Sequence, residues 1–162
     1  MGILILILIG IGIYILYQYF AVNSPEKIIQ ENEDLATTLL SSEKAIGKSI
    51  YGREELDEHI LLMRDWYARL KEKYKHDKTK LMQLAKDWKD YAYYFTSKST
   101  SVYLWIEEDD KENADEMEQE IKEKIFAIEE IENRFAHLLG DEYKKKLDEL
   151  RTLDKEKADL LI

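Results

Sequence analysis

The first twenty-two residues carry no formally charged side chain, and nearly all of them are apolar. A helix rises about 1.5 Å per residue, so a helical segment of this length crosses the hydrocarbon core of a bilayer, which is about 30 Å thick. In lipid a lone segment must be helical, because its backbone N–H and C=O groups find no other partners. The sequence therefore predicts a transmembrane helix over residues 1–22 and a domain tethered to it.

A cleaved secretory signal is the main alternative for this segment. Such a signal has a basic start, an apolar run of roughly 7 to 15 residues and a small-residue cleavage site. Here the first basic residue is Lys27, the apolar run is longer, and residues 20–23 form a poor cleavage site. We therefore expect an uncleaved anchor in the lipid bilayer. The aromatic side chains expected at its membrane interface are Tyr14, Tyr17, Tyr19 and Phe20.

The orientation of the anchor depends on the basic residues close to it. Lys and Arg near the ends of a span hold that flank in the cytoplasm. Only Lys27 lies close to the predicted span, and acidic residues such as Glu31 and Glu33 follow it. The flank slightly favours an extracytoplasmic position for the domain, so we expect a single-pass membrane protein of that orientation.

The chain is acidic and poor in helix-breaking residues. It has 24 Lys and Arg residues against 34 Asp and Glu residues, a net charge of −10, which argues against nucleic acid as a partner. The absence of cysteine excludes disulfides, zinc-thiolate sites and thiol catalysis. With one proline and six glycines in 162 residues, the composition predicts an all-α fold with a single domain over residues 23–162.

Apolar periodicity divides this domain into about four helices. Ser24 is suited to cap a helix that begins at Pro25, with a hinge at these two residues beside the membrane. That helix is expected over residues 25–51. Its apolar stripe runs through Leu35 and Leu39, and Ala36 and Leu40 widen the stripe on one side. The following stripe keeps an unbroken four–three spacing, and Asp77 is its only polar member. The remaining helices are expected at 53–95, 102–139 and 141–161.

The segment TSKSTS, residues 96–101, predicts a turn, because serine and threonine compete for backbone hydrogen bonds. Residues 102–106, VYLWI, are strand-like in composition, but a strand without a partner is unstable, so we expect a helix start or an irregular plug. A turn at 96–101 creates an elongated antiparallel, coiled-coil-like hairpin. It would bring the basic residues of 64–80 beside the acidic residues of 107–132; the alternative is that both faces are solvated.

Aromatic residues gather on both sides of the predicted turn. The set consists of Trp88, Tyr91, Tyr93, Tyr94, Phe95, Tyr103 and Trp105. Positions 91, 93, 94 and 95 spread over most of the circumference of a helix, so some of these rings should be exposed. Exposed tyrosine and tryptophan are typical of protein contacts, which makes this set a candidate interaction patch at the hairpin tip. A packed plug at the end of the bundle is the alternative.

The sequence contains none of the common catalytic or metal-binding motifs. His59, His76 and His137 each lack the glutamate three residues earlier that a di-iron bundle needs. The acidic run at 107–110 lacks the ligand alternation and the glycine of a calcium loop. We expect no catalytic residues, no metal and no cofactor. The predicted function is a membrane-anchored helical scaffold or accessory protein that recruits a protein partner or a second copy; a ligand-sensing extracytoplasmic bundle is the alternative, and an enzyme is the least favoured class.

Overall fold

The structure, a computed structural model, describes residues 24–107 and 114–159 and is all-α over these ranges. Its helices are α2 (Pro25–Tyr51), α3 (Glu58–Lys73), α4 (Lys78–Glu107), α5 (Ala114–Leu139) and α6 (Asp141–Asp159). The predicted transmembrane helix, with Tyr14, Tyr17, Tyr19 and Phe20, lies outside the described residues. Among the helices that are described, none is long and apolar enough to cross a membrane.

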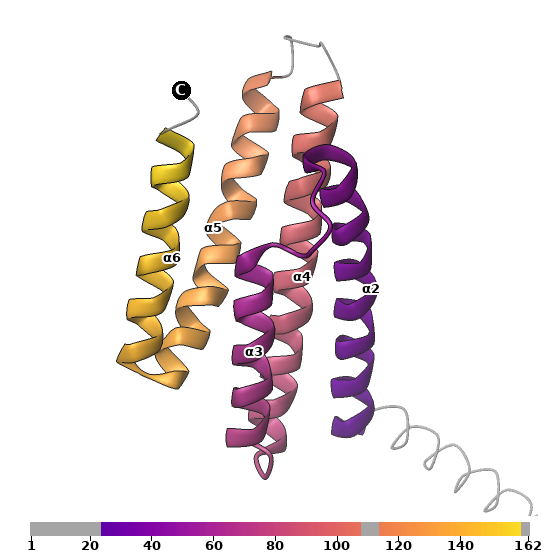
Figure 1. The fold of residues 1–162 in the computed structure, drawn as a ribbon. Helices are drawn as coiled ribbons and strands as arrows, with labels where there is room; N and C mark the ends of the chain where they lie inside the picture. Colours follow the sequence, from indigo (N-terminus) through magenta and orange to yellow (C-terminus); the bar gives the residue numbers. More distant parts are fainter. Residues whose placement is uncertain (1–23, 108–113, 160–162) are drawn as a thin grey trace, which may run out of the picture.

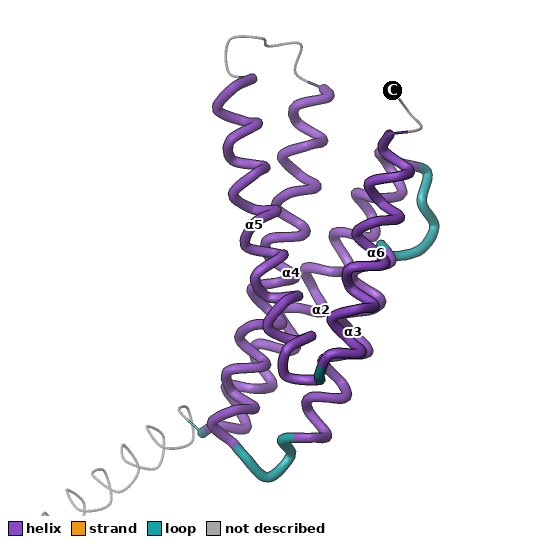
Figure 2. The backbone as a smooth tube through the Cα atoms, turned by 90° about the vertical axis from the view of Figure 1, so that its left-hand side faces the viewer, coloured by secondary structure: helices purple, strands orange, loops and turns teal. Residues whose placement is uncertain are grey.

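The helices form a bundle around α4. In Figure 1, α2, α4 and α6 run in one direction, and α3 and α5 run in the other. Helix α4 contacts α2, α3 and α5, while α6 packs mainly on α5. Figure 2, turned by 90°, shows the same helices as a layered bundle in which α4 and α5 extend above the start of α3. The prediction of a helical bundle is confirmed.

Helix α2 begins and ends where the sequence predicts. The Ser24 side chain accepts a hydrogen bond from the Lys27 amide at 3.3 Å, and Pro25 occupies the first turn. Gly52 ends the helix in the left-handed conformation, with a φ of 62° that a residue with a Cβ atom adopts at a cost. The predicted hinge residues therefore act as the N-terminal cap of α2.

The buried face of α2 is displaced from the predicted stripe. Ala36, Leu40 and Glu43 are buried, whereas Leu35 is 53% exposed. The cause is the close packing of α2 on α4, where small side chains face each other. The Thr96 hydroxyl of α4 reaches across this interface and donates a hydrogen bond to the Leu39 carbonyl at 3.1 Å.

The prediction of one helix over 53–95 is wrong. Residues 53–57 are not helical, α3 ends at Lys73, and the chain reverses before α4 begins at Lys78. Asp77 explains the break, because its carboxylate accepts a hydrogen bond from the Lys80 amide at 3.0 Å and so caps α4. The one polar member of the apolar stripe thus marks a helix start. The stripe residues on both helices, from Ile60 to Phe95, still supply much of the core.

The prediction of a turn at 96–101 is also wrong, because these residues lie within α4. Thr96, Ser99 and Ser101 are buried, and their small size allows neighbouring helices to approach closely. The Thr100 hydroxyl donates to the Thr96 carbonyl at 2.9 Å, which satisfies it inside the helix. Residues 102–106 continue α4, so the predicted helix 102–139 is divided between α4 and α5.

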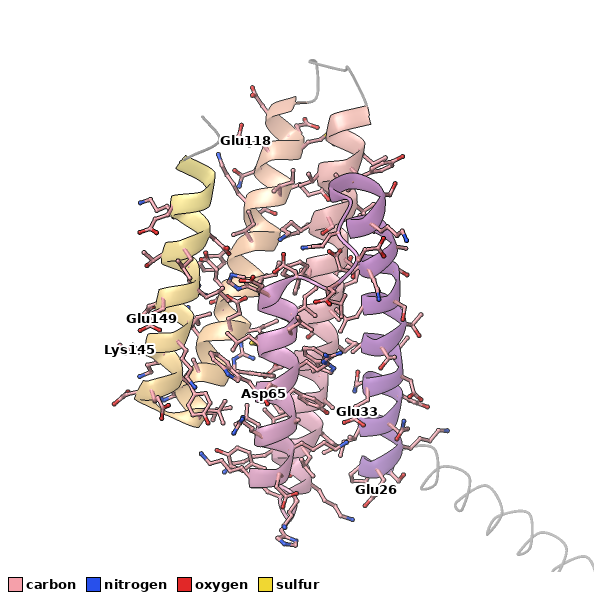
Figure 3. The ribbon with its side chains drawn as sticks, in the orientation of Figure 1. Glu26, Glu33, Asp65, Glu118, Lys145 and Glu149 are labelled. Atoms are coloured by element: carbon pink, nitrogen blue, oxygen red, sulfur yellow. The ribbon has the colours of Figure 1, made fainter. Side chains whose placement is uncertain are left out.

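Helices α4 and α5 form the antiparallel pair, but their register and ion pairs differ from the prediction. Arg134 bonds Asp87 at 2.7 Å, and Lys124 bonds the Ser101 hydroxyl at 2.7 Å, so position 80 does not lie near 117. Two of the basic residues before 81 pair instead with acidic residues of α2. Lys71 contacts Glu33 at 2.6 Å and Lys78 contacts Glu26; both glutamates are labelled in Figure 3.

The cap at Asp77 gives a direct test of the break between α3 and α4. We expect Asp77→Ala to lower the free energy of unfolding by about 1 kcal/mol, because it removes the acceptor for the Lys80 amide. Urea denaturation followed by far-ultraviolet circular dichroism measures this change. Asp148→Ala, within α6, is the control and should stay within about 0.5 kcal/mol of the parent. Equal effects of the two substitutions would contradict the capping role.

Candidate functional site

The predicted aromatic patch is divided between the core and the surface. Trp88, Tyr91 and Phe95 are buried. Trp88 stacks on Tyr91 with ring centroids 5.8 Å apart and on Tyr67 of α3 at 5.5 Å. These three rings of α4 therefore hold the bundle together and are not available to a partner.

Tyr93 and Tyr103 lie on the outer side of α4, and Tyr94 is half-buried against the core. Tyr93 is 54% exposed and meets Tyr94 edge-on at 5.4 Å, and Tyr103 is 37% exposed. The side chain of Trp105 is outside the described part of the structure. Trp88, Tyr91, Tyr93, Tyr94 and Phe95 do not lie at the tip of the hairpin, because α4 continues to Glu107, whereas Tyr103 lies close to that end of the helix.

The outer surface of α4 carries no formal charge from residue 91 to residue 106. Between residues 91 and 106 the only charged residue is Lys98, and its ammonium group lies inside, 3.8 Å from the centroid of the Phe95 ring. We name this surface the uncharged α4 face. It consists of the exposed residues Tyr93, Thr100, Tyr103 and Leu104, together with the half-buried Tyr94 and Ser97.

A shallow hollow adjoins the uncharged α4 face. Tyr103 lines it together with Ala45, Ile46 and Ser49 of α2, and its volume is about 280 Å³. These four side chains are also uncharged. The neutral surface therefore extends across α4 onto α2.

A second cluster, which the sequence did not predict, consists of charged side chains inside the bundle. His59, next to the start of α3, is held on both sides by carboxylates. Its Nδ1 lies 2.7 Å from Glu132 of α5, and its Nε2 lies 2.8 Å from Asp154 of α6. Burial alone would lower the pKa of His59, but the hydrogen bonds and negative charges of Glu132 and Asp154 outweigh it and raise this pKa.

Glu132 is the centre of this cluster. Its side chain is 1% exposed, and it contacts groups from three other helices. One carboxylate oxygen accepts from His59 and from the Tyr91 hydroxyl at 3.4 Å, and the other accepts from Arg151 of α6 at 2.8 Å. Burial is the main reason that the pKa of Tyr91 is raised, and the negative charge of Glu132 adds to it.

Two further ion pairs join the end of α2 to the segment that precedes α3. Arg53 contacts the fully buried Glu43 at 3.0 Å and Asp57 at 2.6 Å. Burial raises the pKa of Glu43, while a hydrogen bond from Ser99 and the charge of Arg53 oppose the increase. A Cβ atom at Gly47 would lie 2.7 Å from Arg53 Nη2, so glycine leaves the room that this guanidinium needs.

A cavity of about 400 Å³ lies against the charged cluster. Its apolar wall consists of Phe95, Ile125 and Ile128, and its polar lining includes Lys98 and Arg151. Burial lowers the pKa of Lys98, although the nearby carboxylates of Asp57, Glu43 and Glu132 favour its charged form. The cavity therefore combines an apolar wall with a polar lining of mixed charge, in which Lys98 and Arg151 lie among the carboxylates of Asp57, Glu129, Glu132 and Asp154.

The chemistry of the cluster is that of a structural network. Both ring nitrogens of His59 are engaged with carboxylates, so neither is placed to take a proton from another molecule. Within residues 24–107 and 114–159, no group of three or more His, Asp or Glu side chains could hold a metal ion. Sequence reasoning favoured a solvated or structural role for His59 over that of a metal ligand, but it did not predict the partners of this side chain. The position of Glu132 could have indicated a buried carboxylate. It lies four residues after Ile128 and three before Phe135, which is the spacing of a buried helix face.

Comparison of the chain with known protein families, with curated proteins and with solved structures finds no match. A functional assignment therefore rests on the sequence and on the geometry of these two surfaces.

The His59 bridge predicts a pH dependence of stability. The pKa of His59 is raised in the folded state above its ordinary value of about 6.5. The resulting stabilisation is complete at pH values below 6.5, and it is lost as the pH rises through the pKa of the folded state. We expect the difference in unfolding free energy between the parent protein and His59→Gln to shrink from about pH 6 to about pH 8.

Urea denaturation at several pH values measures that difference. Other titrating groups, including Lys98, are common to both proteins, so their contributions largely cancel. His76→Gln is the control, because no hydrogen bond or ion pair joins His76 to another helix within the described residues; it should leave the pH profile unchanged. A constant difference between the parent protein and His59→Gln over this range would refute the bridge.

Proposed function

We propose that this protein is a single-pass, membrane-anchored helical scaffold that recruits a protein partner through the uncharged α4 face. The observation that carries the proposal is the lack of charge on this exposed surface in a chain of which 36% is charged. Exposed tyrosines bury large areas in a complex at little entropic cost, and contact surfaces are depleted of charge at their centre.

The position of the face suits a scaffold. The chain enters the bundle at Ser24, at the same end as the start of α4. Residues 93–104 lie roughly 20 to 40 Å along α4 from that end, at about 1.5 Å per residue. A partner bound there would be held at a fixed distance from an anchor formed by residues 1–22.

Site-specific photo-cross-linking of the full chain in its native membranes tests the proposal. Tyr93→benzoylphenylalanine should give a discrete adduct in carbonate-washed membranes, and the mass of the adduct distinguishes another protein from a second copy. Glu149→benzoylphenylalanine, on the charged outer side of α6 in Figure 3, should give none.

Charge insertion supplies the matched control. Leu104→Lys places a charge in the uncharged α4 face and should reduce the adduct about tenfold. Leu153→Lys replaces a similarly exposed leucine on α6 and should not reduce it. An adduct that is insensitive to Leu104→Lys would contradict docking on this face, and release of the chain by the carbonate wash would contradict the anchor.

Ligand sensing is the second candidate function, and the cavity beside the charged cluster favours it. Its volume of about 400 Å³ is in the range of small-molecule sites, which are about 300 to 1,000 Å³. It lies where α4, α5 and α6 meet the start of α3, so a bound molecule would contact all four elements.

A further inference from the structure

The apolar stripe that the sequence predicts for α2 lies on the outer side of the helix. Leu35 is 53% exposed, and Leu39 and Ile46 are only partly buried. The main contact of α2 is with α4, through a different side of the helix that includes the buried Ala36. We name the outer residues the α2 stripe, which is spaced by threes and fours and consists of Asn32, Leu35, Leu39, Ser42, Ile46 and Ser49.

The α2 stripe and the uncharged α4 face form one surface. Tyr103 of α4 shares a shallow hollow with Ile46 of α2, and a second hollow, of about 350 Å³, joins Asn32 of α2 to Lys89 of α4. Both hollows are lined by α2 and α4 alone, so they follow the seam between these two helices. The stripe and the uncharged α4 face therefore lie side by side, and together we name them the α2–α4 face.

The α2 part of this face is also uncharged. Charged residues of α2 between positions 32 and 50 lie elsewhere: Glu33, Asp34 and Lys44 line a groove towards α3, Glu43 is buried, and Lys48 pairs with Glu54. Two copies of a chain with a net charge of −10 repel each other. An uncharged face lets such copies approach without bringing like charges together.

Opposite charges occur at one level of the bundle axis, at the end of the face where the chain enters. Glu31 adjoins Asn32, which shares the second hollow with Lys86 and Lys89. Both lysines contact the same carboxylate, that of Asp90, at 2.7 and 3.0 Å. One carboxylate balances one of these two positive charges, so α4 carries an excess positive charge at the level where α2 carries Glu31.

This pattern is complementary to itself. A two-fold axis parallel to the helices would place α2 of each copy against α4 of the other, with every residue at an unchanged level. Glu31 of one copy would then face Lys86 and Lys89 of the second copy, and the same contact would occur twice. The contact of Glu31 with Lys27, at 3.8 Å between two exposed side chains, is a weak ion pair that leaves this carboxylate able to exchange partners.

We propose that the α2–α4 face binds a second copy of this chain, with the two α2–α4 pairs packed face to face and all four helices parallel. The inference names the partner of the proposed scaffold and rests on that proposed function. Helices α2 and α4 run in the same direction (Figure 1), and copies anchored in one membrane by residues 1–22 would share this direction. The second copy would cover Leu35, Leu39 and Tyr93.

Cysteine cross-linking tests the arrangement, because the chain has no cysteine of its own. Ser42 and Thr100 lie at nearly the same level, since Thr96 bonds the Leu39 carbonyl. Two differently tagged full chains, Ser42→Cys and Thr100→Cys, are produced together in native membranes and oxidised. A disulfide needs Cβ atoms about 4 Å apart, so the mixed dimer should exceed each unmixed dimer at least about fivefold.

Matched variants control for chance encounters. Leu35→Lys in both chains places a charge in the α2 stripe and should reduce the mixed dimer about tenfold. Leu153→Lys, which replaces a similarly exposed leucine on α6, should leave it unchanged. Thr152→Cys, at an exposed threonine of α6, should give no mixed dimer with Ser42→Cys.

The outcomes decide the proposal. A dominant mixed dimer that Leu35→Lys reduces and Leu153→Lys does not supports it. A dominant dimer of Ser42→Cys chains would indicate antiparallel copies and overturn it, as would a mixed dimer that is absent or insensitive to Leu35→Lys. A Tyr93 photo-adduct with the mass of another protein would retain the scaffold and overturn the second copy as its partner, so the two proposals can fail separately.

Discussion

A carboxylate buried in a helical bundle must obtain hydrogen bonds from its neighbours, and Glu132 obtains them from three sides. His59 at the start of α3, Tyr91 of α4 and Arg151 of α6 all meet this one side chain of α5. Removing any single partner would leave a buried charge less well compensated, which is far more costly than losing a surface ion pair. This requirement favours one placement of α3, α4 and α6 around α5.

The contact between α2 and α4 is organised differently, by size more than by charge. Ala36 on α2, and Ala92, Thr96 and Ser99 on α4, leave space for the two backbones to approach. The same choice of residues explains the uncharged α4 face, because a helix segment built from small hydroxyl residues and aromatic rings has few positions left for charges. Packing on one side of α4 and neutrality on the other thus come from one stretch of sequence.

Periodicity predicted the class of fold, the bounds of α2 and much of the core, because apolar spacing reports burial directly. It could not place the chain reversals. Asp77 occupied a position in an unbroken stripe, and only its hydrogen bond to the Lys80 amide shows that it starts a helix. TSKSTS has the composition of a turn, but burial against α2 overrides that local preference, as tertiary packing often does. The charged cluster depends on contacts such as that of His59 with Asp154, 95 positions later in the chain, which local pattern cannot supply.

The parallel arrangement of α2 and α4 has a mechanical consequence. Helix α2 is the first element after Ser24, and its main contact is with α4 along a length of about 40 Å for its 27 residues. A force applied at Ser24 along the axis of α2 would load this interface in shear. Contacts such as Lys78 with Glu26 and Thr96 with Leu39 would then bear the force at the same time and would not break one after another. A bundle attached in this way resists tension applied at its N-terminal end better than one attached through a helix that could be peeled away.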